Sequence, residues 1–176
     1  RTGVLATGPY EVGAFVRSDP SSVRPDAQLY LGAYTFDRGK DNFPVSLDQV
    51  EREPGLTIYG QLLRLTSEGT LRITTSNAEG RLFIAPNWLS TEHDRRVAVA
   101  MVRYMRRYVR QPALRPFIAR EIAPGDECQT DEQILDAVRR LASCGLHAVG
   151  TCRMGCDNGA VVDGGLRVRG VEGVRV

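Results

Sequence analysis

The stretch from Thr91 to Arg110 restricts the fold more than any other part of this sequence. Thr91 can accept a hydrogen bond from the amide of Asp94, and acidic residues fill the first turn, as is usual where a helix begins. Apolar residues then recur at helical spacing until the pattern stops before Pro112. The stretch therefore predicts an amphipathic helix with a buried stripe made of Val97, Met101, Tyr104, Met105 and Tyr108.

Short β-rich runs precede this helix. Residues 29–36 have the period of a strand with one aromatic face, since Leu29, Leu31 and Ala33 alternate with Tyr30, Gly32 and Tyr34. Residues 56–65 and 70–75 flank a connection that ends at Gly69, and we expect them to pair as a hairpin. A third strand is expected at 81–85, after a turn. These runs and the helix predict an α+β fold, with a mostly antiparallel sheet and helices packed on one face.

A second helix is predicted to begin at Thr130. Thr130 and Gln133 have the spacing of a capping box. Gly145 is placed to end the helix in a left-handed turn. The buried stripe of this helix should consist of Ile134, Leu135, Val138 and Leu141.

Composition restricts the class of protein. With 176 residues and 42% hydrophobic content the chain can bury one sizeable core. A net charge of +2 provides no field that would recruit nucleic acid, and no apolar run approaches the roughly 18 residues of a membrane segment. We expect neither as a partner, and we interpret the four cysteines as reduced thiols. The first residue is not Met and the last residues resemble an unfinished strand, so we interpret the chain as a fragment of a longer protein.

Several side chains allow both a functional and a structural interpretation. Tyr30 and Tyr34 could line a pocket, but we favour packing between the sheet and a helix. His93, in the first turn of the first helix, is expected to be a surface residue. A basic stripe on the same helix could bind phosphate, although a solvated helix face is the interpretation we favour; it consists of Arg103, Arg106, Arg107 and Arg110.

The candidate for chemistry is the stretch from His147 to Gly155. It combines one of only two histidines with glycines that let backbone be shaped around a ligand. Neutral imidazole can accept a proton near neutral pH, which is what oxidation of an alcohol requires. A structural histidine is the alternative on residue type alone.

This stretch resembles the C-terminal region of the glucose-methanol-choline (GMC) family of flavin-dependent alcohol oxidoreductases. The family pattern His-x-x-Gly-Thr-Cys-x-Met-Gly can be read from His147 to Gly155, and Val-Val-Asp and a Leu-x-Val-x-Gly-Val strand follow at Val161 and Leu166. Looser matches lie at residues 13–18 and 87–90. In the family pattern Arg-Pro-x-Ser-x-Gly, the residues Arg64, Ser67 and Gly69 match, while Leu65 replaces the usual Pro.

The resemblance implies FAD as cofactor and an alcohol as small-molecule substrate. It implies that hydride passes from the alcohol carbon to flavin N5 while His147 accepts the hydroxyl proton. Val149, Gly150 and Thr151 would contact the cofactor, and Leu146 would contact the substrate. The family's second catalytic His or Asn, and its Gly-x-Gly-x-x-Gly dinucleotide fingerprint, are absent from this sequence.

The resemblance also divides the chain. Residues 1–143 would form the substrate-binding domain, and residues 144–176 would return to the FAD domain of the same chain, which this sequence does not contain. We therefore expect the fragment to be inactive and not to bind FAD by itself. Residues 161–176 are expected to be poorly ordered or abnormally paired. We expect a cytoplasmic location for the parent protein. Both dehydrogenase and oxidase activity remain open for it.

Two other functions remain open at this stage. The first is a zinc-stabilised interaction module, since four ligand-type residues fall within thirteen positions: Cys144, His147, Cys152 and Cys156. Their spacing is not that of the usual paired knuckles. The second is a structural or regulatory domain that keeps the fold without catalysis.

Overall fold

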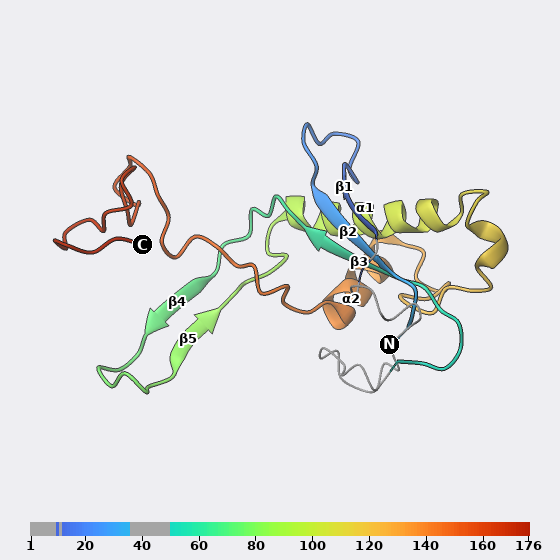
Figure 1. Cartoon of the computed structure of the whole chain (residues 1–176), viewed down its shortest axis with the longest axis horizontal. Helices are drawn as coiled ribbons and strands as arrows, with labels where there is room; N and C mark the ends of the chain where they lie inside the picture. Colours follow the sequence, from blue (N-terminus) through green and yellow to red (C-terminus); the bar gives the residue numbers. More distant parts are fainter. Residues whose placement is uncertain (1–9, 11, 36–49) are drawn as a thin grey trace, which may run out of the picture. The chain divides into compact units, whose positions relative to one another are not determined.

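The computed structural model describes residues 10, 12–35 and 50–176. It divides into two compact units (Figure 1). Unit 1 comprises Arg1–Gly69 and Asn87–Ser143, and unit 2 comprises Thr70–Pro86 and Cys144–Val176. The described elements are β1 (Val12–Val16), β2 (Ala27–Gly32), β3 (Thr57–Leu62), β4 (Thr70–Ile73), β5 (Leu82–Ala85), α1 (Glu92–Val109), the 3-10 helix η3 (Arg115–Phe117) and α2 (Asp131–Leu141).

Unit 1 is built on an antiparallel sheet in the order β1-β2-β3. The connection between β1 and β2 is held by Asp26, which is almost completely buried. Its carboxylate accepts hydrogen bonds from the amide and hydroxyl of Ser18, at 2.7 and 2.8 Å, and from the amide of Asp19 at 3.1 Å. Burial alone would raise the pKa of Asp26, but hydrogen bonds from Ser22, Ser18 and Asp19 outweigh it and lower the pKa.

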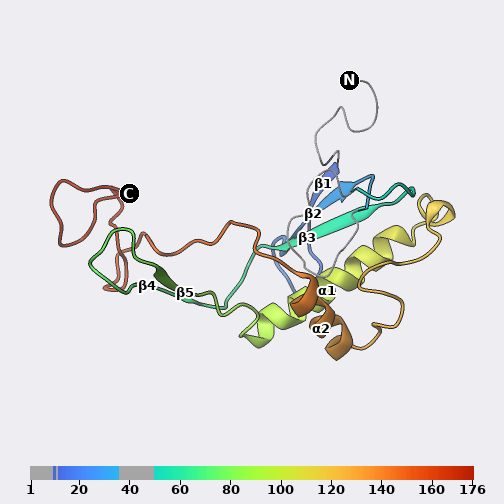
Figure 2. The same cartoon turned by 90° about the horizontal axis from the view of Figure 1, so that it is seen from below.

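Helix α1 packs on one face of this sheet, and α2 packs on α1 (Figure 2). Between sheet and α1 the core contains Ala27, Leu29 and Met101. Gly60 leaves room for Met101, because a Cβ at position 60 would lie 2.6 Å from the Met101 sulfur. A second core fills the contact between α1 and α2 and consists of Val99, Val102, Cys128, Ile134 and Ala137. The α+β class is confirmed, with both helices on one side of the sheet.

The predicted helix starts are confirmed. The Thr91 hydroxyl accepts the amide of Asp94, and Thr130 forms the expected capping box with Gln133. The predicted end of the second helix is wrong. Helix α2 ends at Leu141, and its C-cap Ala142 is extended, so Gly145 does not end the helix in a left-handed turn. Tyr108, predicted to be buried on α1, is exposed.

The predicted hairpin pairing is also wrong. β3 pairs with β2, and β4 pairs with β5 around the turn at 77–80. The strands were located correctly, but their partners were not. A strand pattern fixes which side chains share a face and says little about which strand lies alongside. Phe36, the last residue of the expected strand 29–36, lies outside the described residues, and β2 ends at Gly32.

The basic stripe on α1 is not a uniform solvated face. Arg106 is buried and forms an ion pair with Glu121 at 2.8 Å. It also donates hydrogen bonds to the carbonyl oxygens of Cys128, at 2.7 Å, and Gly125, at 3.1 Å. Arg103, one turn earlier, forms an exposed ion pair with Asp131. Arg106 therefore anchors the connector between the two helices, which the sequence interpretation missed.

Tyr30 does not pack between sheet and helix, contrary to the sequence prediction. Leu29 faces α1, so its neighbour Tyr30 lies on the opposite face of the sheet, paired in register with Tyr59. Tyr10 packs against both rings, with centroid distances of 5.2 Å to Tyr30 and 5.5 Å to Tyr59. Burial and the neighbouring Tyr10 raise the pKa of Tyr34.

Unit 2 contains the β4–β5 hairpin and the segment from Cys144 onward. Within the segment from Cys144 onward, isolated β-bridges take the place of regular strands: Met154 pairs with Val162, Val162 with Val168, and Arg167 with Arg175. Val162 is buried, whereas most of the segment is exposed. In the part of the chain that the structure describes, no helix combines the length and apolar character needed to cross a membrane.

Candidate functional site

The loop matching the family pattern around Ser67 is fixed to the start of α1. Asp94, fully buried in the first turn, accepts hydrogen bonds from the amides of Thr66, at 2.8 Å, and Ser67, at 2.9 Å. The Ser67 hydroxyl in turn accepts the amides of Ser90, at 2.9 Å, and Thr91, at 3.3 Å. Both chain segments that lead to and from the β4–β5 hairpin are therefore held at one place in unit 1.

Asp94 is charged in this setting. Burial would raise its pKa, but hydrogen bonds from Ser67 and Thr66 together outweigh burial and lower the pKa. The carboxylate also lies at the N-terminus of α1, where the helix dipole favours negative charge. Ser67, the serine of the family pattern, therefore has a structural role here: it links its loop to the start of α1 through these hydrogen bonds.

The predicted site residues lie together on the segment that follows α2. Leu146 has a positive φ of 58°, which is uncommon for a residue with a side chain, and Gly150 has a φ of 114°. A Cβ built at Gly150 would meet no atom within 4 Å. The amide of Leu146 donates to the Cys144 sulfur at 3.3 Å, and the Gly150 carbonyl oxygen accepts the amide of Arg153 at 3.2 Å.

All five predicted site residues are exposed. Leu146 and Val149 expose 87% and 95% of their surface, and His147, Gly150 and Thr151 are exposed as well. Among the described residues, no hydrogen bond or ion pair reaches the imidazole of His147. The structure brings these residues together as one short surface segment and does not surround them with a pocket made of described residues.

The second half of the same motif is joined internally. Arg153 forms a two-pronged ion pair with Asp157, at 2.6 and 2.8 Å, and this contact lowers the pKa of Asp157 far below its usual range. The Arg153 carbonyl oxygen accepts the amide of Val161 at 2.8 Å. Asp163 accepts the amides of Gly165 and Arg167, and the hydrogen bond from Arg167 lowers the pKa of Asp163.

The zinc alternative has no support. In the ranges 10, 12–35 and 50–176, no three side chains among His, Cys, Asp and Glu come close enough to hold a metal ion. Cys144, Cys152 and Cys156 are exposed free thiols, and Cys128 is a buried one.

Comparison with known proteins identifies the family. A family model described as GMC oxidoreductase matches residues 66–176, which include the Ser67 loop, the β4–β5 hairpin and the His147 segment. The chain therefore belongs to the GMC oxidoreductase family.

Individual relatives support the same family. An oxygen-dependent choline dehydrogenase of Escherichia coli is 37% identical over 175 residues, and the protein of that name from Escherichia coli strain HS is 36% identical. Each match covers 99% of this chain and 30% of the relative. The crystal structure of pyridoxine 4-oxidase from Mesorbium loti resembles this chain with a TM-score of 0.75 and 26% identity, over 91% of this chain and 30% of that one. The chain thus spans about 30% of the length of these relatives.

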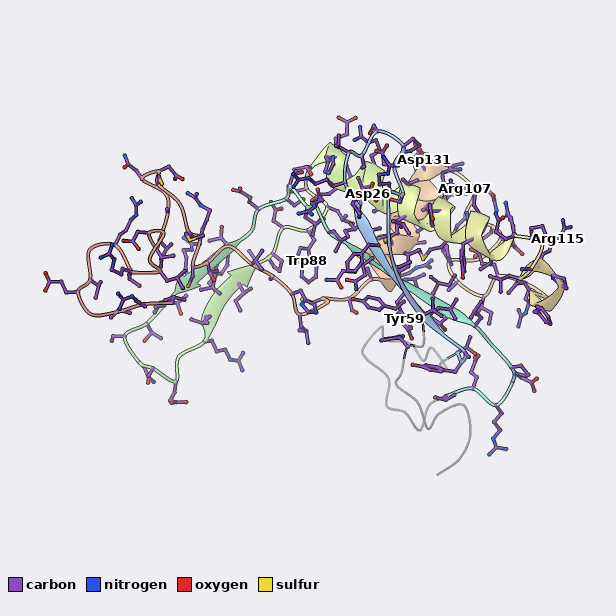
Figure 3. The ribbon with its side chains drawn as sticks, turned by 45° about the horizontal axis from the view of Figure 1, so that its top comes forward. Asp26, Tyr59, Trp88, Arg107, Arg115 and Asp131 are labelled. Carbon is purple, nitrogen blue, oxygen red and sulfur yellow. The ribbon has the colours of Figure 1, made fainter. Side chains whose placement is uncertain are left out.

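Sequence reasoning missed two features of unit 1. The contact between Ser67 and Asp94 joins residues 27 apart, and neither residue type nor spacing indicates it. The tyrosine cluster includes Tyr59, which the sequence analysis placed in a strand without assigning it a face (Figure 3). The strand pairing, once known, puts Tyr59 opposite Tyr30.

Proposed function

We propose that this chain is the substrate-side and proton-accepting part of a longer FAD-dependent alcohol oxidoreductase. The observation that carries the proposal is the exposure of His147 on a segment shaped by two positive-φ residues, Leu146 and Gly150, inside the region matched by the family model. Residues 1–143 supply the substrate-binding domain, and residues 144–176 return to an FAD domain elsewhere in the longer chain.

The residues of the segment fit contact with a flat cofactor. Open space around Gly150 lets the backbone approach a ring closely, and Val149 and Thr151 present exposed surface on either side. FAD supplies a hydride acceptor, its N5 atom, when it is bound. The chain lacks the Gly-rich dinucleotide fingerprint, so tight binding of FAD requires the rest of the longer protein.

His147 acts as the proton acceptor in this proposal. The alcohol hydroxyl gives its proton to the neutral imidazole as the hydride leaves the carbon, and a carbonyl product results. The exposed Leu146 side chain covers the reacting carbon and helps to exclude water once the site is assembled. The described residues leave the His147 ring without a hydrogen-bond partner, so in this proposal groups beyond the described residues orient it.

The substrate class is a small alcohol. The relatives named for choline and pyridoxine make these two compounds the first alcohols to test. By itself the 176-residue chain should be inactive and should not retain FAD. A cytoplasmic location remains a prediction, as does the choice between oxidase and dehydrogenase activity.

The test uses visible absorption of the longer protein. Flavin bands of the wild type should bleach after anaerobic addition of an active alcohol, and the His147→Ala variant should bleach about 10² to 10⁴ times more slowly. His93→Ala is the matched control, because His93 is the other histidine and lies in the first turn of α1. Its Nε2 atom is 3.2 Å from the carbonyl oxygen of Arg64. Equal bleaching rates in wild type and His147→Ala would refute the assignment.

A further inference from the structure

The β4–β5 hairpin has one face made entirely of aliphatic side chains. Leu71 lies opposite Ile84, and Ile73 lies opposite Leu82. Because cross-strand partners and alternate residues point to the same side, all four side chains share one face. They expose between 46% and 79% of their surface, and the face carries no charge. We call these four residues the aliphatic face.

The opposite face of the hairpin is different. It carries Thr70, Arg72, Phe83 and Ala85. The guanidinium of Arg72 lies over the Phe83 ring, 4.7 Å from its centroid, and covers part of that apolar surface. On the face with Phe83, a charged side chain therefore covers part of the apolar surface. No polar side chain among the described residues is known to cover the aliphatic face in this way.

A hairpin of this kind is not expected to persist alone in water. Within the described residues β4 and β5 pair only with each other, and an isolated two-stranded hairpin is marginally stable at best. A contiguous exposed apolar patch, unlike scattered apolar residues, indicates a surface that is covered in the assembled protein. The aliphatic face therefore needs a packing partner.

We propose that the aliphatic face packs against the additional part of the longer polypeptide, the part that the relatives possess and this chain does not span. The relatives devote only 30% of their length to the region matched here. The hairpin shares a compact unit with Cys144–Val176, the segment assigned above to the return toward that additional part. The hairpin is thus a second docking element, although it lies within residues 1–143.

A linked segment fits this face better than a second copy of the chain does. Stable complexes between separate proteins bury about 1,200 to 2,000 Å² in total, which four partly exposed side chains cannot supply. A segment of the same polypeptide needs less area because covalent linkage gives it a high effective concentration. The Ser67 and Asp94 contacts, with the side-chain amide of Asn87 donating to the Glu68 carbonyl oxygen at 3.1 Å, hold together the two chain segments that lead into the hairpin.

Hydrogen exchange of residues 70–86 tests the proposal. The inference rests on the longer polypeptide of the proposed function but not on His147 or flavin chemistry. Backbone amides of the hairpin should exchange at least about tenfold more slowly in the longer protein than in the 176-residue chain. Equal rates in the two proteins would overturn the proposal. Protection that rises with the concentration of the 176-residue chain would assign the face to a second copy and would overturn it as well.

A double variant sharpens the test. Ile73→Thr combined with Ile84→Thr keeps β-branched side chains, and so the strand preference, while it makes the face polar. In the longer protein this variant should lose the added protection. The control is Val23→Thr, which alters an exposed aliphatic residue of unit 1. This control should keep the added protection of the hairpin amides. Retained protection in the double variant would contradict docking through this face.

The two proposals fail separately. His147→Ala should leave the hairpin protected, because the docking does not use the imidazole. Slow exchange of the hairpin with no effect of His147→Ala on bleaching would remove only the catalytic assignment. Normal bleaching kinetics with an unprotected hairpin would remove only the docking assignment.

Discussion

The two motif-bearing regions of this chain use their residues in opposite ways. In the first region, the Asp94 carboxylate and the Ser67 hydroxyl are satisfied inside unit 1 by hydrogen bonds from neighbouring backbone amides. Around His147, the five predicted site residues are exposed and the imidazole has no partner among the described residues. The first region holds the fold of unit 1 together, whereas the second leaves its side chains exposed among the described residues.

The largest effect expected on the fold side comes from Arg106. Arg106→Ala should lower the free energy of unfolding of the 176-residue chain by roughly 3–5 kcal/mol, because it leaves the partly buried Glu121 and two carbonyl oxygens without their partner. Urea denaturation measures the change. Arg103→Ala is the control on the same helix face; its exposed pair with Asp131 should contribute no more than about 1 kcal/mol. Similar losses in both variants would show that the connector is not anchored as described.

The next effect concerns the contact between Asp94 and the Ser67 loop. Asp94→Ala leaves the amides of Thr66 and Ser67 without an acceptor and should cost roughly 2–3 kcal/mol of unfolding free energy. Asp94→Asn, which keeps one acceptor oxygen, should cost less. If Asp94→Ala has the same denaturation midpoint as wild type, the region around Asp94 and Ser67 does not hold the fold of unit 1 together.

The same carboxylate predicts a pH dependence. The pKa of Asp94 is lowered in the folded chain, so its stabilising contribution is complete above the ordinary Asp pKa of about 3.9 and is lost as pH falls through the lower folded-state pKa. Asp94→Asn should therefore flatten the acid side of the stability profile and leave the neutral side parallel to wild type. Urea midpoints measured between neutral pH and the acid limb give both slopes.

A smaller effect is expected at the second capping box. Thr130→Ala removes the acceptor for the Gln133 amide at the start of α2 and should cost about 1 kcal/mol. Thr130→Ser, which keeps a hydroxyl at the cap, should restore most of the loss. Thermal unfolding followed by circular dichroism distinguishes the three proteins.

Local patterns in the sequence predicted the elements better than their partners. Both helix starts followed from side chains within three residues of each other, and the cap hydrogen bonds confirm them. The pairing of β3 with β2 depends on residues about 30 positions apart, which no turn residue near Gly69 could indicate. Arg106 was grouped with exposed arginines because helical spacing does not reveal that Glu121 lies beside it.

The candidate site was predictable as a segment but not as a geometry. The motif from His147 to Gly155 located the residues, and the family match includes them. The structure adds that Arg153 and Asp163 support the rest of the segment through ion pairs at 2.6 and 2.9 Å. The imidazole of His147 has no hydrogen-bond partner among the described residues, and a motif that names residue types carries no information about how such a ring is oriented.

The smallest expected effect on the fold is the sharpest test of the comparison. His147→Ala should change the free energy of unfolding of the 176-residue chain by less than about 0.5 kcal/mol, because an exposed side chain that no described residue contacts by a hydrogen bond contributes little to stability. Val162→Ala, in the same unit, removes a buried side chain and should cost roughly 1–3 kcal/mol locally. Hydrogen exchange of residues 150–170 reports both changes. A marked loss of protection in His147→Ala would mean that the histidine holds this segment together, and the contrast between the two regions would fail.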